Sequence, residues 1–531
     1  MSIDLEEKRV RDPEMMDTQS TLETGMADVI RKDNTEAESN DAVLAQKIHL
    51  INNAIDEVGF TWHHAKLFVI AGFGYSIDSQ MEMIQSSVKV YVDYQMLGTG
   101  FPISNEIFYA GLICGSIVFG MGSDLIGRKV VFNTSIFLTS IFGFLTGGMD
   151  SYPMYCIFMF LSAFAAGGNI ATDVAVFLEY LPSKYQYLNT TMALFWGVGQ
   201  TIAALISWAF IPNNSCDGAD YCPSNINRGW RYCWYVNSGV CLFAALVRVF
   251  VLKMEETPKF LVTCGKDEDA FEVLKNISDK YDRPLTLTVE DLKSCGTINQ
   301  DYFDPIKDGY SIKALLQAMV VNLKILFQSK IVARSTLLVF LSWGFIGISY
   351  STFYNFLYIF IAMHGGDTGS TVYITYRNAT IDNFVGIFGP ILAGALILVK
   401  FKAFGREIMV GRRGTMAFGA LASMAILFGY TTVRTPAGDA GFGSATYFFI
   451  NIYYATLYAY TPEIFPTKAR GTGVGVSLVV SRVFGAFAPV VYYFGAKSSS
   501  SVPIWVCGAI IGSLSIIALL MPFEPSRKRV V

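Results

Sequence analysis

Four ionisable residues stand out inside the long apolar stretches of this 531-residue chain: Asp78, Glu82, Asp173 and Arg482. A charge at the centre of a bilayer costs at least about 2.5–3.5 kcal/mol on insertion scales, so each residue needs a partner or a function. Asp78 and Glu82 share one helical face, and two neighbouring carboxylates in a low dielectric can hold a proton near neutral pH. Their spacing predicts proton uptake and release, with Asp173 as a third candidate. The alternative is that each acid only anchors a neighbouring helix through hydrogen bonds.

Arg482 lies far from both ends of its apolar stretch, so its side chain cannot easily reach water. A guanidinium is a planar donor that matches a carboxylate, which predicts an anion-binding site. The alternative is a permanent salt bridge with Asp78, Glu82 or Asp173. The anion site and the salt bridge can coexist if a bound anion competes with the acid for Arg482. Further side chains that could line a binding cavity for a ring-bearing ligand are Trp196, Gln200, Trp343, Tyr350, Tyr354 and Asn355. Aromatic residues in membrane helices also serve as packing or interface anchors.

A charged cassette occurs twice in the chain, at a constant offset of 284 residues. Gly127-Arg128-Lys129 returns as Gly411-Arg412-Arg413, and the segment 179–184 returns as 463–468, each beginning with Glu and holding a Pro at its fourth position. In a membrane protein, a repeat of this size predicts two homologous helix bundles with a path between them. The buried charges are not repeated, because the offset pairs Asp78 with Ala362 and Arg482 with Val198. The cassettes are therefore expected to be machinery common to both halves, and the unrepeated charges to carry specificity.

The composition indicates a membrane protein, since 52% of the residues are hydrophobic and only 16% are charged. Twelve apolar stretches have the length of about 20 residues that crosses a bilayer. We predict an all-α membrane protein with twelve transmembrane helices in two pseudo-symmetric six-helix bundles. The predicted parts are an N-terminal tail at 1–65, a bundle at 66–252, a linker at 253–333, a second bundle at 334–522 and a tail at 523–531. The N-terminal tail is expected to be mostly disordered, with one surface helix at about 43–58.

Lysine and arginine gather on one side of the predicted spans, which places both termini and the linker in the cytoplasm. The same topology places the sequon at Asn213 outside, where a glycan could be attached. Cys216 and Cys222 lie in the same loop and are candidates for a disulfide. These features predict passage through the secretory route, and we expect the plasma membrane rather than a vacuolar or other organelle membrane.

Several functional classes are disfavoured by the residue inventory. A net charge of −3 without a basic cluster gives no reason to expect a nucleic-acid partner. The nine cysteines and four histidines show no zinc-like spacing and no nucleophile-base pattern, so we expect no metal, no cofactor and no enzyme activity. The expected partners are a small-molecule substrate, protons and the lipid bilayer, with the chain acting as a monomer.

Three segments resemble the major facilitator superfamily, within its group of sugar and organic-ion porters. They are the loop 120–129, the segment Glu255-Glu256-Thr257-Pro258-Lys259 and the segment 460–473. The resemblance implies a cytoplasmic gate formed by Asp124, Arg128, Lys129, Glu179, Arg412, Arg413, Glu463 and Arg470. The sequence departs from the family pattern of this network at two places. Ile408 stands where the second loop would carry its aspartate, with Glu407 as a candidate substitute, and Gln186-Tyr187 stands where Arg-Gly is common.

Within this group, the chain looks like the branch of synaptic-vesicle-2-like, nicotinate and aromatic-acid transporters. The segment 342–355 lacks the paired glutamines of typical sugar porters, and the segment 481–489 resembles span eleven of organic-anion transporters, which carries an arginine. The resemblance implies a proton-coupled transporter that moves a small organic anion by alternating access. The alternatives are a sugar or polyol facilitator or proton symporter, and a non-transporting membrane sensor built on the same fold.

Overall fold

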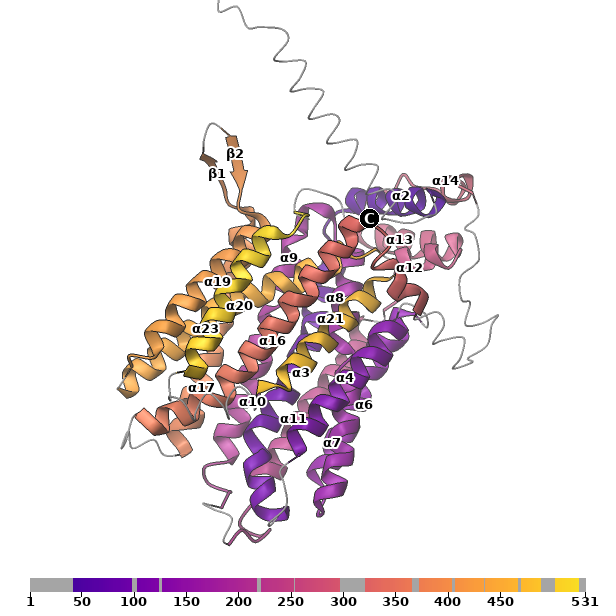
Figure 1. The fold of residues 1–531 in the computed structure, drawn as a ribbon. Coiled ribbons are helices and arrows are strands. Elements are labelled where there is room, and N and C mark those ends of the chain that lie inside the picture. Colours follow the sequence, from indigo (N-terminus) through magenta and orange to yellow (C-terminus); the bar gives the residue numbers. More distant parts are fainter. Residues whose placement is uncertain are drawn as a thin grey trace, which may run out of the picture.

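The computed structural model describes residues 42–97, 103–123, 127–216, 221–252, 254–296, 320–364, 372–403, 406–433, 435–466, 469–488 and 502–524. The regular secondary structure in these ranges is helical except for one short hairpin. Figure 1 shows the long helices lying side by side, with several short helices gathered at one end.

The N-terminal half consists of six helical segments, of which two continue into a π-helix and two are interrupted by a two-residue turn. They are α3 (Trp62–Met96), α4 (Ser104–Gly115) with the π-helix η1 (Ser116–Met121), α6 (Arg128–Gly147), α7 (Tyr152–Ala166) with α8 (Asn169–Tyr180), α9 (Tyr187–Thr191) with α10 (Leu194–Phe210), and α11 (Gly229–Val247) with the π-helix η3 (Arg248–Leu252). The 3₁₀ turn η2 (Ser183–Tyr185) connects α8 to α9.

The C-terminal half repeats this order. Its helices are α16 (Lys330–His364), α17 (Val372–Gly386), α18 (Phe388–Leu398), α19 (Gly411–Tyr430), α20 (Pro436–Ile464), α21 (Arg470–Gly485) and α23 (Val502–Leu520). Seven helical segments in the described ranges are long and apolar enough, by length and composition, to cross a membrane. The full count of twelve spans stays a prediction.

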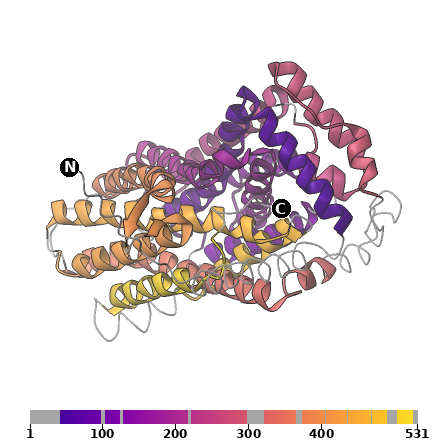
Figure 2. The same cartoon turned by 90° about the horizontal axis from the view of Figure 1, so that it is seen from above.

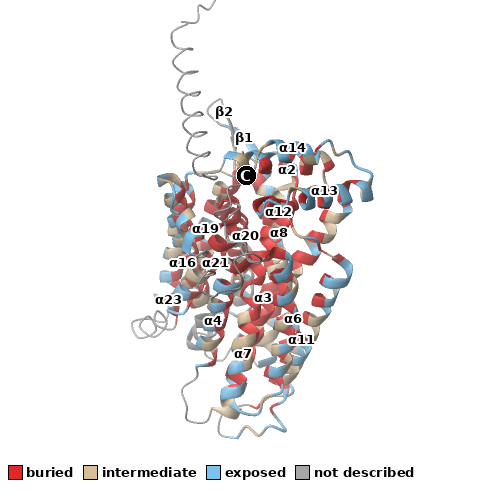
Figure 3. Cartoon of the chain, turned by 90° about the vertical axis from the view of Figure 1, so that its right-hand side faces the viewer, coloured by how far each residue is buried: buried red, intermediate tan, exposed pale blue. Residues whose placement is uncertain are grey.

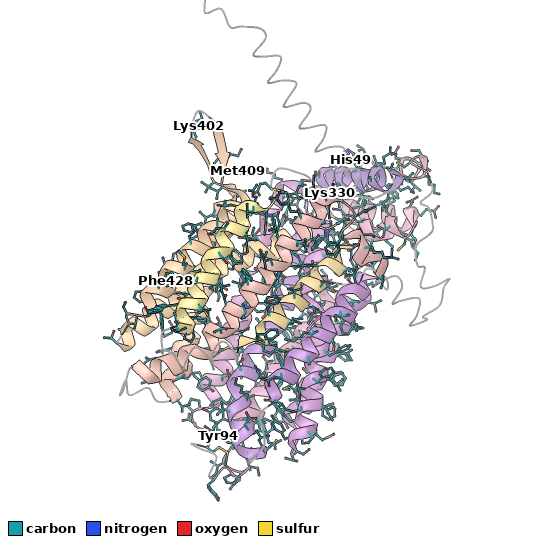
Figure 4. The ribbon with its side chains drawn as sticks, viewed as in Figure 1. His49, Tyr94, Lys330, Lys402, Met409 and Phe428 are labelled. Atoms are coloured by element: carbon teal, nitrogen blue, oxygen red, sulfur yellow. A yellow bond between two sulfur atoms is a disulfide. The ribbon has the colours of Figure 1, made fainter. Side chains whose placement is uncertain are left out.

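The outer surface of the helices is apolar. Large side chains such as Phe243, Phe250 and Leu519 are more than half exposed, and Phe428 lies on the outer flank of the C-terminal half (Figure 4). Buried residues instead concentrate along the central helices α3, α8 and α20 (Figure 3). An exposed apolar belt of this extent is the surface that a protein presents to lipid.

A cap of short helices covers one end of the N-terminal half (Figure 2). It consists of α2 (Ala42–Val58), α12 (Pro258–Thr263), α13 (Asp267–Tyr281) and α14 (Val289–Ser294). The segment predicted as a surface helix is α2, and it is docked. Its apolar face, including Leu44 and Ile51, is buried, and Lys47 Nζ lies 2.6 Å from Asp267 Oδ2.

The connection between α18 and α19 differs from the expected helix-to-helix turn. It forms an antiparallel hairpin of β1 (Lys400–Ala403) and β2 (Arg406–Met409), which projects from the bundles in Figure 1. Lys402 pairs with Glu407 in its register. The backbone therefore places Glu407, the candidate substitute for the missing aspartate, in a strand.

Candidate functional site

We call the end of the bundles that carries the cap the basic end, because Arg128, Arg412 and Arg470 lie there, and the other the disulfide end. At the disulfide end Cys216 and Cys222 form a disulfide, with their Cα atoms 5.4 Å apart. Asn213, in the same loop, is exposed.

The side chain of Arg482 on α21, in the C-terminal half, contacts residues of the N-terminal half. Its Nη2 atom lies 3.4 Å from each carboxylate oxygen of Asp78 on α3. Its Nη1 atom donates to the carbonyl of Leu112 at 2.8 Å and to the hydroxyl of Ser116, where α4 changes into the π-helix η1. Of the three acids considered as partners, this state of the protein pairs Arg482 with Asp78. The N···O distance of 3.4 Å is longer than the 2.7–2.9 Å of a close charge-assisted hydrogen bond.

Glu82 lies one helical turn beyond Asp78 on α3. It accepts a hydrogen bond from Tyr109 Oη at 3.0 Å, and it is half-buried. The two carboxylates line one small cavity together with Arg482, and Trp343 and Tyr350 contribute to the same wall. The expected juxtaposition of the two acids with Arg482 is therefore present.

A second cavity of about 390 Å³ continues from this point. The two cavities share Glu82, Tyr109, Tyr350 and Ser351. The larger one extends along the last turns of α3 to Tyr91, whose carbonyl accepts from Asn227 near the disulfide end. The cavity thus leads away from the basic end.

Of the other predicted ligand residues, Trp196 also lines the small cavity. Gln200 on α10 lines the larger cavity and donates through Nε2 to Tyr350 Oη at 2.8 Å, which joins the two halves. Trp343 donates to Thr461 at 2.9 Å and packs edge-on against Tyr458. Tyr354 and Asn355 belong to α16, and their side chains lie outside the described residues.

Three tyrosines in the cavity wall escaped the sequence analysis. Tyr109 comes from α4, and Tyr454 and Tyr458 come from α20, where their rings stack 5.8 Å apart. The spacing of four residues in a tyrosine-rich segment would have been the available signal, since it places two rings on one helical face.

Asp173 does not join Arg482. Its Oδ2 atom lies 3.0 Å from Nη2 of Arg248, a residue that the sequence analysis did not single out. Arg248 also donates to the carbonyl of Phe132 at 2.6 Å and covers the ring of that residue at 3.6 Å. Both charged side chains are at most 1% exposed, and neither is among the described residues that line the cavities. This geometry corresponds to the anchoring alternative for Asp173.

The basic end is closed by a cluster around Glu179 at the end of α8. Arg128, from the same half, contacts this carboxylate, and Arg470 Nη1 from the other half lies 3.0 Å from it. Thr257 Oγ1 donates to the second oxygen at 2.6 Å. Glu179 is fully buried, so one acid holds the two halves together at this end.

The two cassettes share a backbone arrangement that their glycines permit. Glu256 accepts hydrogen bonds from the backbone N–H groups of Arg128 and Lys129, and Glu524 accepts them from Arg412 and Arg413. A negative charge at a helix N-terminus is stabilised by the N–H groups and the helix dipole.

Gly127 precedes α6 with a φ of 105°, and Gly411 is the first residue of α19 with a φ of 61°; both values favour glycine. A Cβ atom there would also meet the capping glutamates at 2.7 and 2.6 Å. The Lys129 side chain is exposed, and Arg413 donates to the carbonyl of Ala518 within its own half. Neither belongs to the contact between halves, and Asp124 lies outside the described residues.

The cross-half contacts at the basic end are unequal. Arg412 pairs with Glu463 inside the C-terminal half, and its Nη2 atom donates to the backbone carbonyl of Gln186 at 3.3 Å. The 284-residue offset makes Gln186 the counterpart of Arg470. Glu179 of the N-terminal half is thus contacted by an arginine of the other half. In the corresponding place, Arg412 of the C-terminal half contacts a backbone carbonyl, that of Gln186.

Lys259 on α12 is buried beside this cluster. Burial, with the positive charges of Arg470 and Arg128, lowers the pKa of Lys259 to about 7, against the opposing effect of Asp56. Among the residues that the structure describes, no group of three or more His, Cys, Asp and Glu side chains could hold a metal ion.

Comparison with known proteins agrees with this architecture. The chain is 36% identical over 495 residues to MFS siderochrome iron transporter 1 of Ceriporiopsis subvermispora, covering 91% of this chain and 92% of the relative. It is 25% identical to Organic anion transporter 3 of Oryctolagus cuniculus, covering 79% and 68%, and 25% identical to the niacin transporter NiaP of Acinetobacter baylyi, covering 81% and 86%.

A solved structure of the proton:xylose symporter XylE, bound to 6-bromo-6-deoxy-D-glucose, has the same fold. The TM-score is 0.63 at 17% identity, covering 88% of this chain and 98% of XylE. Residues 67–489 match the family profile of the Major Facilitator Superfamily. This chain is an integral multi-pass membrane protein that belongs to the major facilitator superfamily of transporters.

Proposed function

We propose that the protein moves a small organic anion across the membrane together with a proton, by alternating access. The observation that carries the proposal is the contact between Arg482 and Asp78, because it places an anion-binding group and a proton-binding group from opposite halves in one cavity. The alternating step fits a cavity that leads away from the basic end while Glu179 and Arg470 close that end.

Substrate binding begins at Arg482. An incoming carboxylate competes with Asp78 for the guanidinium, and the 3.4 Å separation makes Asp78 a weakly held partner. Once displaced, Asp78 is a buried carboxylate without its counter-charge, and such a group binds a proton readily. Glu82, next to it on α3, delivers or shares that proton. Anion binding and proton binding are thereby linked.

Release requires the opposite movement of the two halves. When Arg470 leaves Glu179, the basic end opens and the substrate departs there, after which Asp78 gives up its proton and pairs with Arg482 again. We assign Asp173 to the packing of the N-terminal half rather than to this proton path, because Arg248 holds it away from the cavity.

The names of the relatives support an anionic substrate, but they point to different compounds. One is named for organic anions and one for niacin, whose ionised form is an aromatic carboxylate. Another is named for siderochrome iron, so an iron chelate is the second candidate. The cavity of about 390 Å³ lies near the lower end of the usual range for ligand sites, which favours the smaller ligand.

Proteoliposomes with an imposed pH gradient test the proposal. The panel is nicotinate, benzoate, xylose and a ferric hydroxamate chelate. We expect gradient-driven accumulation of a carboxylate, loss of binding in Arg482→Ala, and loss of gradient dependence in Asp78→Asn and Glu82→Gln. Glu268→Gln in the exposed linker is the matched control and should behave as wild type. Uptake indifferent to the gradient and to Arg482 would contradict the proposal.

Binding without flux for every compound would instead favour a membrane sensor. For the cellular setting, we propose a monomer in the plasma membrane with both termini in the cytoplasm, so that the disulfide end faces outward. Surface biotinylation of intact cells tests the location.

A further inference from the structure

Lys89 on α3 lies in the wall of the larger cavity. Apart from tyrosines, the ionisable side chains among the described residues of that wall are Lys89 and Glu82. Lys89 was not among the candidate site residues, because it falls just beyond the predicted end of the first span.

The ammonium of Lys89 is available to a ligand. The acids whose charges act on it are Asp93 on the same helix and Glu106 on α4. Neither forms an ion pair with it within the described part of the chain, and its side chain is half-buried rather than enclosed. A cation that faces a cavity without a direct acid partner favours an anion there.

The helix geometry orders the charges along α3. Asp78, Glu82 and Lys89 fall on one face, because four and eleven residues are close to whole numbers of turns. Lys89 is seven residues beyond Glu82, about 10 Å further toward the disulfide end at 1.5 Å per residue. An anion moving inward therefore meets Lys89 first and Arg482 last, and the proton-binding carboxylates lie between them.

We propose that the larger cavity is an outer subsite for small organic carboxylates, in which Lys89 supplies the positive charge. This rests on the proposed transport of an anion and adds where that anion is first held. Tyr91, Tyr109 and Tyr376 contribute aromatic side chains to the same wall, which suits an aromatic carboxylate. A half-buried ammonium attracts the ligand without holding it tightly, so the ligand passes on to the guanidinium of Arg482, which can hold a carboxylate through two bonds.

Initial rates of nicotinate uptake in proteoliposomes, at low and high salt, test the subsite. For Lys89→Gln we expect KM to rise ~5-fold with the maximal rate unchanged, and the salt dependence of KM to disappear. Lys89→Arg should restore both, because it keeps the charge. Nicotinamide, the uncharged amide of the same ring, should compete equally well against wild type and Lys89→Gln.

The matched control is Lys402→Gln on the hairpin, an exposed lysine at the other end of the molecule, which should behave as wild type. An unchanged KM and an unchanged salt dependence in Lys89→Gln would overturn the subsite. If Arg482→Ala still abolishes nicotinate binding in that case, the transport proposal survives alone. If wild type shows no saturable uptake of nicotinate or benzoate, both proposals fall.

Discussion

Asp78 and Arg482 are 404 residues apart in the sequence, yet their side chains meet between the two halves at the base of the cavity. The contact joins α3 to α21, and the guanidinium of Arg482 also donates a hydrogen bond to the carbonyl of Leu112. One ion pair therefore links the two halves, and under the proposed function it is also the contact that an incoming anion opens.

Asp78→Asn should separate binding from coupling. The amide keeps the shape of the side chain but removes the charge that competes with substrate for Arg482. We expect carboxylate affinity to rise about tenfold, which corresponds to about 1.4 kcal/mol, while uptake driven by a pH gradient is lost. Isothermal titration and gradient-driven uptake measure the two effects. Weaker binding in this variant would show that Asp78 contributes to holding the substrate.

Asp173 and Arg248 should behave as a structural pair. Removing either charge alone leaves the other buried without a partner, which costs about 3–5 kcal/mol of stability. Asp173→Asn combined with Arg248→Met should recover much of that loss, as measured by thermal unfolding in detergent. The ratio of protons to substrate should stay at the wild-type value in the double variant, and a changed ratio would return Asp173 to the proton path.

Gln186→Arg should strengthen the weaker side of the closed end. An arginine here can share Glu463 with Arg412, as Arg470 shares Glu179 with Arg128. Stabilising the closed state lowers the fraction of molecules that open at the basic end, so turnover should fall by about tenfold or less. Transport rate and spectroscopic distances across the basic end measure this, and Gln186→Met is the uncharged control. Faster turnover in Gln186→Arg would argue against a gate at this position.

Lys259→Met should stabilise the protein in a pH-dependent way. The folded pKa of about 7 lies below the ordinary value of 10.5, so between these values the unfolded chain binds a proton that the folded protein does not. The folded protein therefore loses about 1.4 kcal/mol of stability for each pH unit as the pH falls from 10.5 to 7, with no further loss below 7.

The methionine variant has no such loss. Its gain in melting temperature should be larger at pH 6.5 than at pH 9.5, and exposed Lys275→Met should show no such trend. Equal gains at both values would mean that the ammonium of Lys259 is solvated.

Asn213→Gln should remove the glycan if the disulfide end faces outward. The exposed position allows a transferase to reach it, whereas the sequon at Asn189 is buried and serves as the internal control. Electrophoretic mobility before and after treatment with a glycosidase reports the result. Unchanged mobility in Asn213→Gln, or a shift in Asn189→Gln, would contradict the predicted orientation.

The sequence by itself determined the membrane class, the repeat and the residues worth attention. The length of an apolar stretch identifies a membrane-spanning helix, because each charged residue in the lipid raises the free energy of the span by itself, whatever the rest of the fold. The unrepeated charges Asp78, Glu82 and Arg482 stood out for the same reason, and they meet in one cavity. Cys216 and Cys222 share one short loop, which made them candidates for a disulfide, and the structure confirms the bond.

Only the tertiary structure decided which charges meet. Asp78 rather than Asp173 faces Arg482, and Arg248 takes Asp173 instead. Hydropathy records how apolar a segment is, but the partner of a side chain depends on the rotation of its helix and on which neighbours lie beside it. The unequal contacts of Gln186 and Arg470, the strands around Glu407, and the place of Lys89 in the cavity wall depend on the same packing.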